Sequence, residues 1–153
     1  IIYRSLWERK FMKYCDLTPN VLNWKSEPFH IPYLCSTDNK WHKYYPDFYT
    51  KIKSKDGIIV EYVIEVKPLK QTKPPKKRKK TKQFIYETLT WGKNQSKWKY
   101  AINYCSKKNW ILTCDADFSS NPTELKRWIK YNYIREKKCC YFGSRKAEKS
   151  RGS

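Results

Sequence analysis

An Asp-Gly pair at positions 56 and 57 separates two segments that are rich in β-branched and aromatic residues. The first segment runs from Tyr45 to Lys53 and the second from Ile58 to Lys67, and both have the length and composition of strands. An Asp-Gly pair between two such segments is a strong signal for a tight β-hairpin. The two segments are therefore expected to pair as adjacent antiparallel strands.

The second strand of this hairpin carries both apolar and charged residues. Because side chains alternate along a strand, Glu65 and Lys67 share one face, while Ile64 and Val66 share the other. The apolar pair can pack under helices. If the strands pair across the turn, Asp47 lies beside Glu65 and Lys67.

Two carboxylates that lie close together repel each other and resist joint ionisation. A divalent cation removes this repulsion, and hard oxygen ligands suit Mg²⁺ or Mn²⁺. Lys67 could orient an attacking water or offset charge on a phosphate, so the set predicts hydrolysis of a phosphodiester bond. The alternative is a solvated face of the sheet, because short acid-x-Lys patterns occur by chance.

The charge of the chain points to polyanionic partners. Its 153 residues include 34 Lys and Arg against 14 acidic residues, a formal net charge of +20. Such an excess attracts nucleic acid first and an anionic membrane surface second. No apolar segment approaches the length of a membrane span and no signal peptide is visible, so we expect a soluble protein. The first residue is Ile rather than Met, which leaves room for missing N-terminal residues.

A run of basic residues extends from Lys70 to Lys82 and contains Pro74-Pro75. Such a run cannot pack into a core, and it predicts a flexible basic loop. It is either a solvated loop or a clamp on the DNA backbone, and its position after Lys67 favours the clamp. The expected DNA-binding residues are Lys70, Lys73, Lys76, Lys77, Arg78, Lys79 and Lys80.

The remaining elements can be read from periodicity and turn residues. We expect a first helix over 6–16, an interrupted strand over 21–35, and a turn at 37–40 that leads into the Asp-Gly hairpin. Further helical pattern runs over 84–105 with a break near Gly92. A last strand over 109–114 and a helix after Pro122 complete the pattern. This order predicts a core over 1–115 and a C-terminal helix with a basic tail over 116–153.

Two further acids are candidates for the site. Glu8 borders the apolar face of the first helix, but Ser5-x-x-Glu8 also forms a capping box, which the spacing alone favours. Glu27 precedes Pro28 at the edge of a strand. It is either a carboxylate that supports the site or a surface charge.

Cysteine and histidine give weaker signals. The six cysteines form no C-x-x-C pair, so we interpret them as free thiols in a reducing compartment. His30 and His42 are too few for an H-N-H site or a classical zinc site. Trp91, Trp98 and Trp110 are expected to be core residues.

Several sequence blocks resemble those of a known family. The blocks YRSLWERKF, VLNWKSEPFHIPY, YYPDFY, VIEVKPLKQTKPP and TWGKNQSKWKYA occur in the order found in head completion nucleases of tailed myoviruses. These belong to the PD-(D/E)XK, or restriction-endonuclease-like, superfamily. The resemblance covers roughly residues 2 to 110, and it extends more weakly to the endonuclease subunit of heteromeric transposases.

The resemblance implies an α/β fold with a restriction-endonuclease-like core, in which helices flank a mixed four-stranded sheet. It also implies a Mg²⁺- or Mn²⁺-dependent deoxyribonuclease with Asp47 and Glu65 as metal ligands and Lys67 as the catalytic lysine. Glu8 would face the metal, which reverses the preference for a pure cap.

The implied function is endonucleolytic cleavage of DNA during phage head completion and DNA packaging, either non-specific or selective for DNA structure. Portal or neck proteins are the implied partners. The host cytoplasm during assembly and the head–neck region of the virion are the implied locations. Two alternatives stay open: a non-catalytic head or neck protein that binds DNA, and a strand-specific endonuclease subunit of the transposase type.

Overall fold

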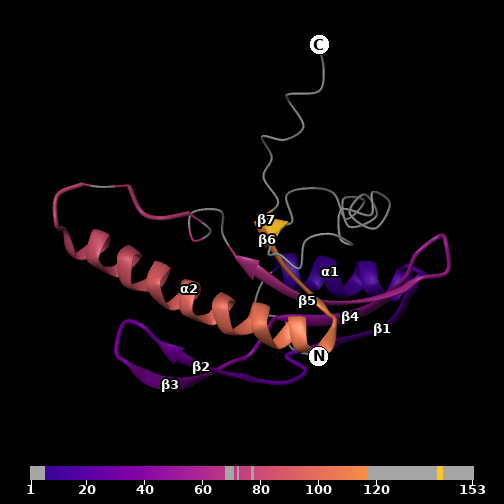
Figure 1. The fold of residues 1–153 in the computed structure, drawn as a ribbon. Helices are drawn as coiled ribbons and strands as arrows, with labels where there is room; N and C mark the ends of the chain where they lie inside the picture. The colour runs from indigo at the N-terminus through magenta and orange to yellow at the C-terminus, as the bar shows by residue number, and fades with distance from the viewer. Residues whose placement is uncertain (1–5, 68–70, 72, 77, 117–140, 143–153) are drawn as a thin grey trace, which may run out of the picture.

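The computed structural model describes residues 6–67, 71, 73–76, 78–116 and 141–142. A five-stranded sheet, a two-stranded sheet and two helices make up this part of the chain (Figure 1). Helix α1 spans Leu6–Leu17 and helix α2 spans Lys82–Lys108. The strands are β1 (Val21–Ser26), β2 (Ile31–Cys35), β3 (Lys40–Tyr44), β4 (Phe48–Lys53), β5 (Ile59–Lys67), β6 (Ile111–Ala116) and β7 (Tyr141–Phe142).

The main sheet has the strand order β1-β4-β5-β6-β7. Strand β4 is antiparallel to both β1 and β5, whereas β6 is parallel to β5 and to the two-residue β7. The expected mixed α/β sheet of four strands is therefore present, with β7 as a short addition at its edge. Helix α2 is the crossover that parallel pairing of β5 with β6 requires.

The β4–β5 hairpin forms where the Asp-Gly pair predicted it. Gly57 has a φ of +80°, a conformation that glycine adopts without steric cost. Its N–H donates to the carbonyl of Ser54 at 3.1 Å, and the N–H of Ser54 donates to the carbonyl of Ile58 at 2.7 Å. This turn sets the register in which Phe48 lies opposite Ile64.

The two faces of β5 pack against different elements. Ile64 and Tyr62 join Phe11, Phe48 and Ile52 in a core under α1. On the opposite face, a second core joins residues of the sheet, α2 and the β2–β3 hairpin: Ile31, Tyr33, Cys35, Tyr44, Val63, Ala101, Cys105 and Leu112. The alternation expected from the sequence is confirmed, and it directs Glu65 and Lys67 to the side of α2.

Two expectations about the elements were wrong. Residues 21–35 form two strands in different sheets, because β2 leaves the main sheet and pairs with β3 alone. Helix α2 runs unbroken through Gly92. A Cβ at Gly92 would lie 3.1 Å from the methyl of Thr37, so this glycine serves close packing of the helix on the β2–β3 turn rather than a break.

The structure also bears on what the sequence predicted for the cysteines, the tryptophans and membrane-spanning helices. Cys15, Cys35 and Cys105 are free thiols and are buried. Trp98 is buried, while Trp91 and Trp110 are partly buried. None of the described helices is long and apolar enough to cross a membrane. The helix expected after Pro122, and the basic tail apart from β7, lie outside the described residues.

Candidate functional site

The β4–β5 hairpin brings Asp47, Glu65 and Lys67 together. Asp47 directly precedes β4, one step beyond the Phe48–Ile64 pair, so it lies opposite Glu65. The N–H of Val66 donates to Oδ2 of Asp47 at 2.7 Å, which fixes this carboxylate at the end of the sheet. Nζ of Lys67 lies 2.8 Å from Oε1 of Glu65. Asp47 therefore shares one site with Glu65 and Lys67, which lie 18 and 20 positions later in the chain.

Glu65 is only 1% exposed, and both of its oxygens have partners. Lys67 pairs with Oε1, and the hydroxyl of Tyr44 donates to Oε2 at 2.7 Å. Tyr44 is the last residue of β3, so the small β2–β3 hairpin contributes directly to the site. A buried carboxylate is stable only when it is paired and hydrogen-bonded, and these two contacts provide that compensation.

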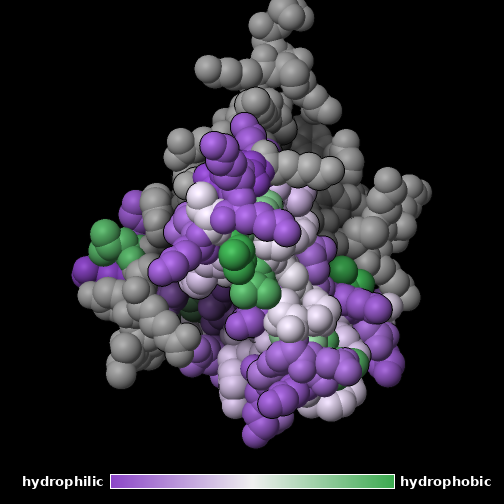
Figure 2. Space-filling model, turned by 90° about the vertical axis from the view of Figure 1, so that its left-hand side faces the viewer, coloured by the Kyte–Doolittle hydropathy of each residue, from purple (hydrophilic) through white to green (hydrophobic). Residues whose placement is uncertain are grey.

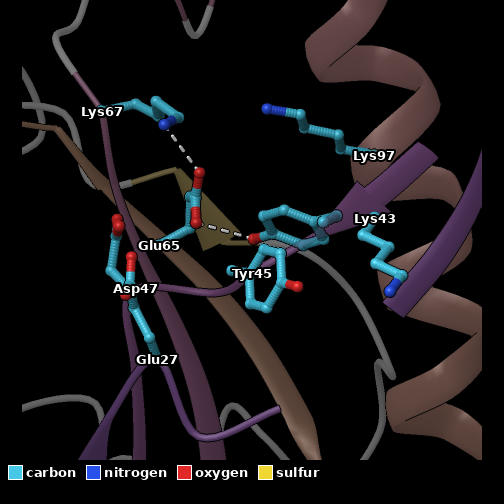
Figure 3. A pocket seen from close by; sticks show the side chains of 8 residues that line it. Glu27, Lys43, Tyr45, Asp47, Glu65, Lys67 and Lys97 are labelled. Atoms are coloured by element: carbon cyan, nitrogen blue, oxygen red, sulfur yellow. Dashed lines mark hydrogen bonds and ion pairs between the residues drawn. The ribbon is translucent and has the colours of Figure 1, made fainter. Parts of the chain in front are cut away.

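These residues line a pocket of about 370 Å³. Figure 3 shows Asp47 and Glu27 on the side of the main sheet, and Lys43 and Lys97 on the side of the hairpin and α2. Lys67 and Lys97 point toward one another across the pocket (Figure 3). The full lining is Glu27, Lys43, Tyr44, Tyr45, Asp47, Glu65, Lys67 and Lys97.

The carboxylates of the pocket repel each other. The pKa of Asp47 is raised from 3.8 to about 7. Burial is the largest cause, and the charge of Glu65 is the second. The Val66 N–H and the charge of Lys67 lower this pKa without offsetting the increase. An additional positive charge beside Asp47 would therefore favour the ionised carboxylate.

Lys97 reaches the pocket from the middle of α2. Its ammonium lies 5.7 Å from the ring centroid of Tyr44, and it forms no salt bridge within the described part of the chain. Burial lowers the pKa of Lys97, as does the nearby charge of Lys67, while Glu65 and Asp47 raise it. A half-buried ammonium without a carboxylate partner is suited to an anionic ligand.

Sequence reasoning missed Lys43, Tyr44, Tyr45 and Lys97. One signal for Lys97 was available, because it lies four positions before Ala101, on the buried face of α2. The others line the pocket only because the β2–β3 hairpin folds back onto the sheet, and no local pattern indicates that.

The two additional acids lie at different places. Glu27 lines the pocket, and its N–H donates to the carbonyl of Asp47 at 3.0 Å. Its φ of +43° is unusual for a residue with a side chain and marks the sharp exit from β1. Glu8 does not line the pocket, but its charge makes a small contribution to the raised pKa of Asp47. Ser5, the other half of the expected capping box, lies outside the described residues.

The basic loop continues from the strand that carries Lys67. Figure 1 shows it running back beside α2 to the start of that helix. Arg78 pairs with Glu87 at 2.7 Å, which ties the loop to α2. Of the expected DNA-binding set, Lys70 and Lys77 lie outside the described residues. The other members are all exposed: Lys73, Lys76, Arg78, Lys79 and Lys80.

The end of the molecule that carries this loop is mostly hydrophilic (Figure 2). A small hydrophobic patch lies within it, and α2 exposes Ile85, Tyr86 and Leu89 in its first turns. The loop and these turns enclose a hollow of about 560 Å³. Lys73, Lys76 and Arg78 line this hollow, and their charges suit a polyanion.

Among the residues that the structure describes, two groups of side chains could hold a metal ion. Asp47 and Glu65 offer carboxylate oxygens, which are the ligands that Mg²⁺ and Mn²⁺ prefer. A cation there would offset the repulsion from Glu65 that contributes, after burial, to the raised pKa of Asp47. Cys35, Asp38 and His42 form a different group at the tip of the β2–β3 hairpin. The sulfur in that group makes it unsuitable for Mg²⁺, so the carboxylate pair is the better candidate for a magnesium site.

Comparisons with known proteins identify the family of this chain. The family described as TnsA-like endonuclease N terminal matches residues 18–113, a range that contains every residue lining the pocket. The head completion nuclease of Enterobacteria phage T4 is 37% identical over 113 residues, which cover 71% of this chain and 73% of that protein. No solved structure matches the chain. A family match over most of the chain and this identity to a phage nuclease together lead to one conclusion: the protein belongs to the TnsA-like endonuclease family.

Proposed function

We propose that this protein is a divalent-cation-dependent DNA endonuclease of the PD-(D/E)XK type that acts in phage head completion. The observation that carries the proposal is the convergence of Asp47, Glu65 and Lys67 in one pocket with Lys97. The family match and the name of the phage T4 relative support the reaction and its setting. The preferred cations are Mg²⁺ and Mn²⁺, because the donor atoms are carboxylate oxygens.

In this mechanism, Asp47 and Glu65 hold the cation. When bound, the cation polarises the scissile phosphate and lowers the pKa of a water molecule. Tyr44 orients Glu65 through its hydrogen bond, and the Val66 N–H orients Asp47. Glu27, at the same rim, supports Asp47 through its backbone N–H. Glu8 adds negative charge from α1 and makes the site more attractive to a cation.

Two lysines act on the phosphate from opposite sides. Lys67, the catalytic lysine of the motif, offsets the charge that develops on the phosphate during hydrolysis. Lys97 binds and positions the same phosphate or its neighbour, since it faces Lys67 across the pocket (Figure 3) and has no salt bridge among the described residues. An ammonium placed before the reaction stabilises negative charge without reorganisation.

The DNA backbone continues from the pocket along α2 to the basic loop. Lys93 lies one helical turn before Lys97 and is exposed. Further lysines follow at the exposed loop, with Lys73, Lys76, Lys79 and Lys80 among them. Because these contacts neutralise phosphates, we expect binding with little sequence preference and a strong dependence on salt. Lys70, Lys77 and Arg78 are proposed to belong to the same surface.

The proposed core extends over residues 1–115, and residues 116–153 are the proposed C-terminal helix with a basic tail. We place the activity in the host cytoplasm during assembly or at the head–neck region of the virion. Portal or neck proteins are the proposed partners. Cleavage there would act on DNA at or near the packaged head.

The direct test is cleavage of supercoiled and linear DNA with Mg²⁺, with Mn²⁺ and with EDTA. We expect metal-dependent cutting by the wild type and none by Asp47→Asn or Lys67→Met. Glu61→Gln is the matched control, because Glu61 lies on β5 outside the pocket and pairs only loosely with Lys51 at 3.9 Å. If the wild type binds DNA but cuts under neither metal, the protein is a DNA-binding head or neck component instead.

A separate comparison tests the role of Lys97. Lys97→Met should lower kcat/KM at least about tenfold, the usual effect of a lost charge contact in a transition state. Lys93→Met, four positions earlier and outside the pocket, should change salt-dependent binding more than kcat. Equal effects of the two substitutions on kcat would contradict the role proposed for Lys97.

The family match also favours a second candidate, a strand-specific endonuclease subunit that works with a partner. Isolated protein would then nick one strand at most. Accumulation of nicked circles without linear product would favour this candidate, whereas linearisation by the protein alone would favour the phage-type nuclease.

A further inference from the structure

Three side chains of metal-binding type meet at the tip of the β2–β3 hairpin. Cys35 ends β2, Asp38 lies in the turn, and His42 is on β3. One ligand atom from each residue lies within 4.8 Å of the other two. This cluster takes no part in the mechanism proposed above.

The register of the hairpin explains why these residues converge. Tyr33 pairs with His42, and Cys35 pairs with Lys40. Antiparallel partners point to the same face, and Cys35 lies two positions after Tyr33, so Cys35 and His42 are diagonal neighbours on one face. Asn39 has a φ of +54°, and its N–H donates to the carbonyl of Cys35 at 2.8 Å. This tight turn brings Asp38 back over the two strand residues.

Existing hydrogen bonds already orient the three groups. Oδ2 of Asp38 lies 2.7 Å from Nε2 of His42, while Oδ1 accepts the N–H of Lys40 at 3.1 Å. The sulfur of Cys35 lies 3.0 Å from the hydroxyl of Thr37. These contacts hold the carboxylate, the imidazole and the thiol close together before an ion binds.

The tip is held firmly against α2. The N–H of Ser36 donates to Oγ of Ser96 at 3.1 Å, and the two serine hydroxyls are 3.0 Å apart. Gly92 lets Thr37 approach the helix closely. Cys35 is fully buried beneath this turn, while Asp38 and His42 are exposed. A rigid turn with one buried and two exposed ligands limits the entropy cost of binding an ion.

We propose that Cys35, Asp38 and His42 bind a divalent transition-metal ion of the Zn²⁺ class, with water as a fourth ligand. Thiolate, imidazole and carboxylate are all ligands of Zn²⁺, and tetrahedral coordination suits four donors. On binding, the Cys35 thiol releases its proton to solvent and its sulfur forms the bond to the ion. The ion would tie the turn to both strands of the hairpin.

This site differs in chemistry from the carboxylate pair in the pocket. Asp47 and Glu65 provide only oxygen, which favours Mg²⁺, whereas a thiolate and an imidazole select softer ions. The simpler alternative is a surface ion pair between Asp38 and His42 that lies above a buried thiol. The two interpretations differ in one respect, which is whether the sulfur of Cys35 contacts the metal.

Co²⁺ provides the test, because a Co²⁺–thiolate bond gives a near-ultraviolet charge-transfer absorption that oxygen and nitrogen ligands do not. Reduced protein is titrated with Co²⁺, and Zn²⁺ is then added. We expect one equivalent to produce the band and Zn²⁺ to abolish it. Cys35→Ser should lose the band, and His42→Asn should weaken Co²⁺ binding at least about tenfold. Cys105→Ser and Glu65→Gln should keep both the band and the affinity.

The proposal is overturned by a wild type without the band, or by a band that persists in Cys35→Ser. The second result would assign the absorption to another cysteine. Because Cys35 is fully buried, its substitution could disturb the fold, so circular dichroism is recorded for each variant. His42→Asn changes an exposed residue, and unchanged Co²⁺ affinity in that folded variant would also refute the site.

Discussion

Removing the hydroxyl of Tyr44 should weaken both the fold and the pocket. This hydroxyl donates to Oε2 of Glu65 at 2.7 Å, and the two residues are only 2% and 1% exposed. In Tyr44→Phe the ring keeps its place in the second core, but one oxygen of a buried carboxylate loses its donor. Because Glu65 is only 1% exposed, little solvent reaches the oxygen that loses this donor.

The size of the effect follows from burial and charge. A hydrogen bond to a charged group contributes about 1.5–3 kcal/mol, and leaving a buried partner unsatisfied costs most where solvent is excluded. Glu65 keeps its ion pair with Lys67, so we expect a loss of about 2–3 kcal/mol in the free energy of unfolding. Urea denaturation at pH 7 in EDTA measures this loss without a contribution from bound metal. Cleavage activity should fall as well, because Glu65 is no longer oriented.

Tyr45→Phe is the matched control. Tyr45 is the next residue and also lines the pocket, but it is 49% exposed. Its hydroxyl can bond to water in both states, so we expect a change within about 0.5 kcal/mol. Equal losses for the two substitutions, or a loss below about 0.5 kcal/mol for Tyr44→Phe, would refute the view that this hydrogen bond holds Glu65.

Two further predictions concern stability. In metal-free protein the pKa of Asp47 is about 7 when folded against an ordinary 3.8, so between these values the folded state retains a proton that the unfolded chain has released. The free energy of unfolding should therefore fall by roughly 4 kcal/mol as pH rises through this window, and denaturation of Asp47→Asn should lack that part of the slope. Gly57→Ala should lower the free energy of unfolding, measured by urea denaturation, by about 1 kcal/mol, because a φ of +80° is unfavourable for alanine. No steric clash adds to this cost, since no atom lies within 4 Å of the added Cβ. An unchanged Gly57→Ala midpoint would show that the turn relaxes.

Local sequence was sufficient to predict the centre of the site. An Asp-Gly turn sets the register of two strands, and register with alternation then decides that Asp47 faces Glu65 and that Lys67 joins them. None of these inferences needs a contact outside the hairpin. The exposed basic loop was also predictable, since a run of lysines with two prolines cannot enter a hydrophobic core.

The other half of the pocket depends on packing between distant segments. Tyr44 reaches Glu65 only because β2 and β3 leave the main sheet, and the sequence of residues 21–35 suggests one interrupted strand instead. The prediction of a helix break near Gly92 was wrong for a related reason. Within a helix it normally weakens the helical pattern, but here it makes room for Thr37. In both cases tertiary contact overrides a local preference.

The charges of the pocket imply that cation and DNA strengthen each other's binding. Burial and the charge of Glu65 raise the pKa of Asp47, while burial and the charge of Lys67 lower the pKa of Lys97 on the opposite wall. A cation at the carboxylates would attract a phosphate, and a phosphate between the lysines would attract the cation.

Linkage requires the two enhancements of binding to be equal. In the non-cleaving Lys67→Met variant, which keeps both carboxylates and Lys97, Mg²⁺ should tighten DNA binding by about five-fold or more, on the order of a typical coupling. Titration of Mg²⁺ with and without DNA should give the same factor for Lys67→Met. Mg²⁺-independent DNA affinity would mean that the phosphate and the cation occupy separate places, and the arrangement of acids and lysines on facing walls would then need another explanation.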